Sequence, residues 1–217
     1  MSWLANILNA LRRAPEAEPQ PADPVPEPAA PLAIEPPPLR TGPLAEITRL
    51  AIDPALALLP AKMDTPRARV MLLAICGQEA DFRHRWQIFD ASRPERMGAA
   101  RGLWQFERGG GVRGVLRHAA SAAHARAVCA ARAWSPTETD VYNCLHLDDV
   151  LAAAFARLLL WTDPRALPDV GDVEGAWQLY LRTWRPGAYT RGTEAQRAGL
   201  RAKWGGYYAQ AVDEVAP

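Results

Sequence analysis

Residues 72–82 read LLAICGQEADF and residues 102–106 read GLWQF, and these two stretches decide the fold. The first lies in an apolar segment that opens with a proline, a favourable residue for the first turn of a helix. We therefore expect a buried helix over residues 66–79 that ends at an irregular, polar segment. The second stretch follows a glycine-containing loop and carries an amide side chain between aromatic residues.

Glu79, at the end of the expected helix, is the candidate chemical group. A carboxyl group that is partly buried beside apolar side chains has a raised pKa, because desolvation penalises the anion. A raised pKa keeps the group protonated near neutral pH, which is the state that a general acid needs. Gln105 adds a neutral amide that can donate to and accept from a substrate.

The two motifs, Glu79-Ala-Asp-Phe82 and Gly102-Leu-Trp-Gln105, resemble those of soluble lytic transglycosylases and goose-type lysozymes. Those families carry Glu-Ser-x-Phe and Gly-Leu-Met-Gln. The resemblance implies a lysozyme-like helical domain with Glu79 as the catalytic acid and base. It implies substrate contacts for the second motif and for a tyrosine on a late helix, and the predicted substrate-binding residues are Gln105, Trp104, Tyr180 and Trp184.

The chain departs from the family pattern in two places. Ala80 stands where the families have serine, and their Ala-Tyr-Asn-x-Gly element has no clear copy. Trp177, Tyr180 and Trp184 recur at helical spacing, and such a stripe is more common in a core than in a cleft. The arginine-rich loop between the motifs is typical of a solvated surface, although its cations could contact acidic groups of a cell-wall polymer.

No second carboxylate is evident from the sequence. Asp90, Glu95 and Glu107 are candidates, but each is more typical of plain surface charge. Without a paired carboxylate, substrate-assisted cleavage is favoured over direct attack of water.

Helical spacing accounts for most of the remaining chain after the proline-rich part. We expect helices over residues 44–59 with an interruption near Pro54, and over residues 113–132, 150–161, 172–184 and 194–213. No convincing period-2 strand appears, so residues 80–112 are expected to be irregular and the fold class is α.

The chain before this domain has two parts. Residues 1–13 place their apolar side chains on one helical face, and so short a helix is marginal alone, so we predict an amphipathic docking helix. Residues 14–43 are rich in proline, which favours an extended linker. The helical, lysozyme-like domain then covers residues 44–217.

Composition excludes several classes of function. The chain has 25 basic and 24 acidic residues, a balance that gives no general attraction to nucleic acid. No apolar run reaches the roughly 20 residues of a membrane span. The four histidines lack metal-ligand spacing, so neither a metal nor a cofactor is expected. The odd number of cysteines favours free thiols at Cys76, Cys129 and Cys144.

The resemblance to lytic transglycosylases and goose-type lysozymes implies a peptidoglycan-degrading enzyme that cleaves the β-1,4 bond between N-acetylmuramic acid and N-acetylglucosamine. Residues 100–116, ARGLWQFERGGGVRGVL, also resemble proteins of tailed phages, which implies a virion protein made in the host cytoplasm that acts at the host cell wall during genome entry. Its predicted partners are peptidoglycan and, through residues 1–13, other virion or tail proteins. The alternatives are a virion structural or adaptor protein that keeps the fold without activity, and a free lysis endolysin.

Overall fold

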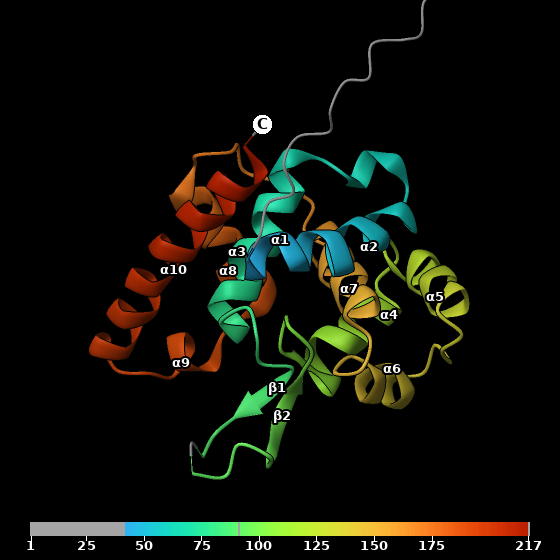
Figure 1. Ribbon diagram of the computed structural model, residues 1–217, viewed down its shortest axis with the longest axis horizontal. Coiled ribbons are helices and arrows are strands. Elements are labelled where there is room, and N and C mark those ends of the chain that lie inside the picture. Colours follow the sequence, from blue (N-terminus) through green and yellow to red (C-terminus); the bar gives the residue numbers. More distant parts are fainter. Residues whose placement is uncertain (1–41, 91, 217) are drawn as a thin grey trace, which may run out of the picture. The chain divides into compact units, whose positions relative to one another are not determined.

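The computed structural model describes residues 42–90 and 92–216, and their mostly helical structure confirms the predicted α class (Figure 1). These residues belong to one compact unit. The predicted docking helix over residues 1–13 and nearly all of the predicted linker over residues 14–43 lie outside the described residues. Pro43, the last residue of that predicted linker, is already the first residue of a helix.

The first helical segment consists of α1 (Pro43–Ile47), a π-helical turn, η1 (Thr48–Ile52), and α2 (Asp53–Ala57). Pro54 does not interrupt it, because this proline lies in the first turn of α2, where a missing N–H is tolerated. The wider π turn before it lets the N–H of Asp53 reach the carbonyl of Thr48. A short 3-10 turn, η2 (Ala61–Met63), leads to the next helix.

Helix α3 (Pro66–Ala80) passes through the core, and most of its residues are buried. It begins at Thr65, whose hydroxyl oxygen accepts from the N–H of Ala68 at 3.2 Å. Helix α10 (Glu194–Val215) packs along it, so that segments far apart in sequence lie side by side (Figure 1). The close approach requires Gly77, since a Cβ there would lie 2.5 Å from the ring of Tyr207.

A small antiparallel sheet follows α3, which corrects the expectation that residues 80–112 are irregular. Its strands are β1 (Trp86–Ile88), β2 (Met97–Arg101) and β3 (Phe106–Glu107), in the order β1-β2-β3. Strands of two to five residues are too short to show a period-2 pattern, so their apolar alternation gave no signal. The β1–β2 hairpin extends away from the helices (Figure 1).

The chain then forms the π turn η3 (Arg108–Val112), α4 (Arg113–Arg117), α5 (Ala122–Ala131) and α6 (Glu138–Cys144). The single helix predicted over residues 113–132 is therefore two helices. The break lies at Ser121, a buried residue whose hydroxyl donates to the carbonyl of Val115 at 2.7 Å. Such a side-chain bond gives the backbone an alternative to continuing the helix.

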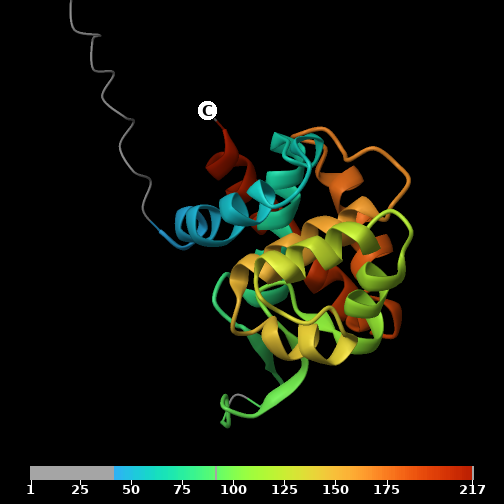
Figure 2. The ribbon, with the colours of Figure 1, turned by 90° about the vertical axis from the view of Figure 1, so that its right-hand side faces the viewer.

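Three helices complete the site region: α7 (Asp149–Trp161), α8 (Val173–Trp184) and the short α9 (Gly187–Thr190), which precedes α10. Helix α7 is buried over nearly its whole length and runs through the middle of the bundle (Figure 2).

Cys76, Cys129 and Cys144 are buried free thiols. Within residues 42–90 and 92–216, no helix has the length and apolarity that crossing a bilayer requires.

Candidate active site

Glu79 lies in the last turn of α3, at the edge of a hollow of about 330 Å³. The walls of this hollow come from the three strands, the π turn η3, helices α7 and α8, the start of α9 and helix α10. The helix ends just beyond Glu79 because Asp81 adopts a left-handed backbone (φ 52°) and turns the chain away. Phe82 secures this turn by packing edge-on against Tyr207, with ring centroids 5.2 Å apart.

Tyr180 is the direct partner of Glu79. Its hydroxyl donates to Glu79 Oε1 at 2.6 Å, across 101 residues of sequence. The tyrosine is only 1% exposed, and its ring stacks on Trp204 at a centroid distance of 5.1 Å. Because the ring is held on both sides by packing and by this bond, the carboxyl group of Glu79 has a fixed orientation.

Burial raises the pKa of Glu79 to about 7. The hydrogen bond from Tyr180 and the positive charge of Lys203 act in the opposite direction, and the negative charge of Glu107 raises the pKa further. The side chain keeps a partly exposed face, and that face borders the hollow. Glu79 can therefore hold a proton near neutral pH at the edge of the hollow.

Gln105 lies close to Glu79 and also borders the hollow. Its backbone is left-handed (φ 48°), a costly conformation for a residue with a side chain. Two hydrogen bonds compensate: Nε2 donates to the carbonyl of Gly102 at 2.9 Å and to that of His84 at 3.1 Å. Gln105 thus braces the loop while it lines the site.

Trp184 borders the hollow from α8, and its indole N–H donates to the carbonyl of Trp104 at 2.9 Å. Trp104 itself lies in the core rather than in the hollow: it is fully buried, and its indole N–H donates to the carbonyl of Leu72 at 2.9 Å. The structure thus brings Glu79, Gln105, Tyr180 and Trp184 together, and it places Trp104 behind them as support.

A second hollow of about 410 Å³ adjoins the first along strand β1. Both hollows are bordered by Glu79, Gln87 and Gln105, so Glu79 lies where they meet. The second hollow is also lined by Trp86, whose indole N–H donates to the carbonyl of Pro94 at 2.8 Å. An extended ligand could pass from one hollow to the other with its central bond beside Glu79.

One polar residue of the first hollow, Gln78, was not predicted as a contact, whereas Glu107 was among the candidate second carboxylates. Gln78 is 4% exposed, and its Oε1 has no hydrogen-bond partner among the described residues. An unsatisfied buried acceptor is costly, and a hydroxyl or amide N–H of a ligand would satisfy it. Glu107 borders the same hollow, whereas Asp90 and Glu95 lie on the β1–β2 connection outside both hollows. Gln78 gave no signal beyond its place next to Glu79.

The arginines of the loop between the motifs are partly committed to ion pairs. Arg83 pairs with Asp81 at 2.5 Å, and Arg85 pairs with Asp149 at 2.6 Å. Arg101 lies over the ring of Tyr142, at 5.0 Å from the centroid. The contacts of Arg85 and Arg101 hold the two ends of the β1–β2 hairpin against α7 and α6.

The described residues contain no cluster of His, Cys, Asp and Glu side chains that could hold a metal ion. No protein-family model matches the chain, and the searches of curated proteins and of solved structures also found no match. The chemistry of the site must therefore be argued from its own groups. These are a carboxyl group with a pKa near neutrality, a fixed hydroxyl donor, and amides and aromatic rings along two joined hollows.

Proposed function

We propose that this domain cleaves the β-1,4 bond between N-acetylmuramic acid and N-acetylglucosamine in peptidoglycan, with Glu79 as the general acid. The observation that supports the proposal best is the 2.6 Å hydrogen bond between Tyr180 and a Glu79 whose pKa is raised to about 7. A neutral carboxyl group held in one orientation beside an extended hollow is what protonation of a glycosidic oxygen requires.

In the proposed reaction, Glu79 gives its proton to the glycosidic oxygen as the bond to the anomeric carbon breaks. The resulting carboxylate accepts the proton of the muramic acid C6 hydroxyl, while the oxygen of that hydroxyl bonds to the anomeric carbon. Glu79 is then protonated again, and the product is an anhydro sugar with no water consumed. Tyr180 stabilises the carboxylate between these two steps, because its hydroxyl donates to Oε1.

The position of Glu107 supports a second route, hydrolysis. This carboxylate borders the same hollow as Glu79, and its charge contributes to the raised pKa of Glu79. In a hydrolase, the second carboxylate activates water or stabilises the cationic sugar. Hydrolysis would give a reducing sugar end, so the product distinguishes the two routes.

Digestion of purified peptidoglycan, with products identified by chromatography and mass spectrometry, tests the proposal. Glu79→Gln should lower the rate by about 10²- to 10⁴-fold, because the variant has no proton to transfer. Glu95→Gln is the matched control, since it makes the same change on the β1–β2 connection, outside both hollows. Near wild-type cleavage by Glu79→Gln would exclude Glu79 as the acid.

The same digestion separates the two routes through Glu107→Gln. Anhydro products and a nearly unchanged rate would support the substrate-assisted route. Reducing ends, together with a large loss of rate in this variant, would support hydrolysis.

The setting that we propose is a phage particle, from which the enzyme acts on the host cell wall as DNA enters the cell. The support is the resemblance of residues 100–116 to tailed-phage proteins and the proline-rich composition of residues 14–43. Residues 1–13 would bind another virion or tail protein. Co-purification with particles, before and after deletion of residues 1–40, tests this placement.

A further inference from the structure

A separate hollow of about 460 Å³ lies at the other end of α3. Its walls come from η2, the first turn of α3, the last turns of α7 and the loop after α7. Glu79 is thirteen residues after Pro66 on α3, a rise of about 20 Å, so this hollow is distinct from the candidate active site.

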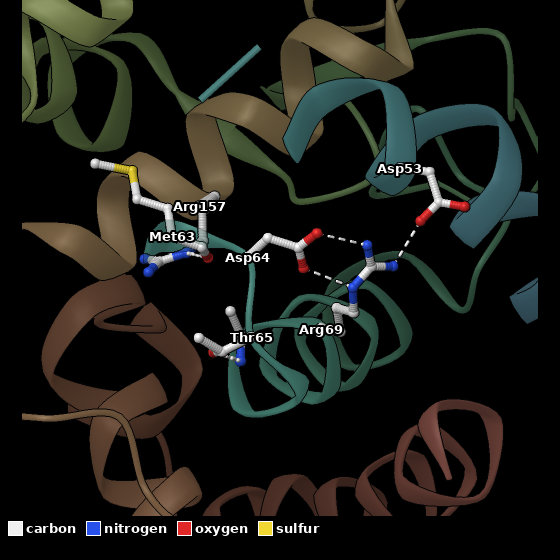
Figure 3. A network of polar contacts seen from close by, with 7 residues as sticks. Asp53, Met63, Asp64, Thr65, Arg69 and Arg157 are labelled. Carbon is white, nitrogen blue, oxygen red and sulfur yellow. Dashed lines mark hydrogen bonds and ion pairs between the residues drawn. The ribbon is translucent and has the colours of Figure 1, made fainter. Parts of the chain in front are cut away.

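The central group of this hollow is Arg157, a residue that is only 2% exposed. Its Nε donates to the carbonyl of Met63 at 2.7 Å (Figure 3). Its guanidinium lies 5.1 Å from the ring centroid of Trp161. Its Nη1 is buried and has no hydrogen-bond partner among the described residues. Burial lowers the pKa of Arg157 to about 10, so the group is still charged at neutral pH.

The nearby acidic groups are already used by other arginines. Asp64 accepts two hydrogen bonds from Arg69, at 2.7 and 2.8 Å, and Figure 3 shows its carboxylate directed toward Arg69. Asp163, which borders the hollow, is paired with Arg182 at 3.0 Å. Asp64 is close enough for its charge to favour the charged form of Arg157, but the hydrogen bonds of both carboxylates go to other arginines.

Further positive charge surrounds the same hollow. The ammonium group of Lys62 lies 5.3 Å from the ring centroid of Trp161, the ring that Arg157 also contacts. Arg165 borders the hollow from the loop after α7. The N-terminus of α3 adds a partial positive charge, because the helix dipole points that way. Cations gathered in this way repel one another unless an anion joins them.

We propose that this hollow is a binding site for an oxyanion, a phosphate or carboxylate group, which the guanidinium of Arg157 and the side chains of Lys62 and Arg165 would contact. The hollow is larger than one such group, and Leu160, Trp161 and Leu167 line the rest of it. The ligand would therefore carry its anionic group on an apolar or ring-shaped body. This inference does not rest on the proposed peptidoglycan activity.

Titration of the full chain with inorganic phosphate, followed by thermal unfolding at constant ionic strength, tests the proposal. A ligand that binds only the folded state raises the unfolding temperature in proportion to the logarithm of its concentration above Kd. We expect a saturable rise with millimolar phosphate that chloride does not give. Succinate serves as the carboxylate probe, and a rise with either oxyanion supports the site.

Lys62→Ala and Arg165→Ala change exposed side chains and should leave the fold intact. Each should weaken the affinity for the effective anion by roughly threefold or more. Arg157→Met should abolish the rise, and Arg126→Ala on exposed α5 surface is the control that removes one positive charge elsewhere. If Arg157→Met does not fold, the two exposed variants decide the question.

Two results would overturn the proposal. One is that neither phosphate nor succinate raises the unfolding temperature beyond the effect of chloride. The other is an equal rise in the wild type, Lys62→Ala and Arg165→Ala, which would show binding elsewhere on the surface. Neither result bears on Glu79, so failure here and failure of the proposed function are distinguishable.

Discussion

The two ends of helix α3 each adjoin a buried ionisable group, and the two groups are held differently. At the C-terminal end, burial raises the pKa of Glu79 to about 7, and Tyr180 donates to its carboxyl group. Near the N-terminal end, burial lowers the pKa of Arg157 to about 10, and its Nη1 has no partner among the described residues. The carboxyl group can gain and lose a proton at neutral pH, whereas the guanidinium stays charged.

This difference suggests different roles for the two ends. A group that titrates near neutral pH with a fixed donor is suited to proton transfer. A group that stays charged without a counter-ion is suited to binding an anion, because an unpaired buried charge is costly. Each prediction below changes one side of this comparison.

Tyr180→Phe should lower the activity by about tenfold to a hundredfold, less than Glu79→Gln does, because the carboxyl group of Glu79 keeps its proton but loses its fixed donor. The hydrogen bond favours the carboxylate, so its removal should also raise the pKa of Glu79. The fall of rate with rising pH should therefore move to higher pH. Rates on peptidoglycan between pH 5 and 9 measure both effects.

Tyr207→Phe is the matched control, since this tyrosine donates to Asp81 rather than to Glu79. A merely structural role of Tyr180 would lower the rate equally at every pH and leave the shape of the profile unchanged.

The stability of the wild type should depend on pH through Glu79. The pKa rises from 4.5 to about 7 in the folded state, so the folded protein holds the proton more tightly than the unfolded chain. This stabilisation is complete below pH 4.5 and is lost as the pH rises through about 7. Glu79→Gln has no such loss. On going from pH 4 to pH 8, the free energy of unfolding of Glu79→Gln should therefore rise relative to that of the wild type by up to about 2 kcal/mol.

Denaturant unfolding of both proteins at pH 4 and pH 8 measures this difference. A constant offset between wild type and variant at the two pH values would mean that Glu79 ionises normally in the folded protein.

Arg157→Met should have the smallest effect, a change of about 1 kcal/mol or less in the free energy of unfolding without added anion. Loss of the hydrogen bond to Met63 is offset by removal of an unpaired buried charge. Denaturant unfolding in chloride buffer measures it. A loss of 3 kcal/mol or more, about what removing one partner of a satisfied buried ion pair costs, would show that Arg157 has a counter-charge after all.

Much of this structure could be predicted from periodicity, and some of it could not. Helix α3 follows an apolar run that opens with Pro66, and α7 is a continuous apolar run after two aspartates, so the positions of both could be predicted from the sequence. The strands of the sheet are too short to show an alternation of apolar and polar residues. The helix break at Ser121 depends on a side-chain hydrogen bond that the sequence pattern does not predict. These features arise from tertiary contacts.

The candidate site divides in the same way. Glu79 could be proposed from the sequence, because an apolar helix ends in a carboxyl group and the motif at residues 102–105 follows it. Its bond to Tyr180 spans 101 residues, and the bond between Arg157 and Met63 spans 94, so neither can be read from a local pattern. Trp104 was predicted to bind substrate from its neighbours in the motif, yet it packs in the core because its indole reaches the carbonyl of Leu72.

The most direct test of the central claim is a titration of the Glu79 carboxyl group by carbon-13 NMR, with Glu79→Gln used to assign its signal. A general acid in this site must hold its proton near neutral pH, so the midpoint should lie near pH 7. A midpoint near 4.5, the ordinary value for glutamate, would contradict the account, because Glu79 would then be a carboxylate at the pH where it has to donate a proton.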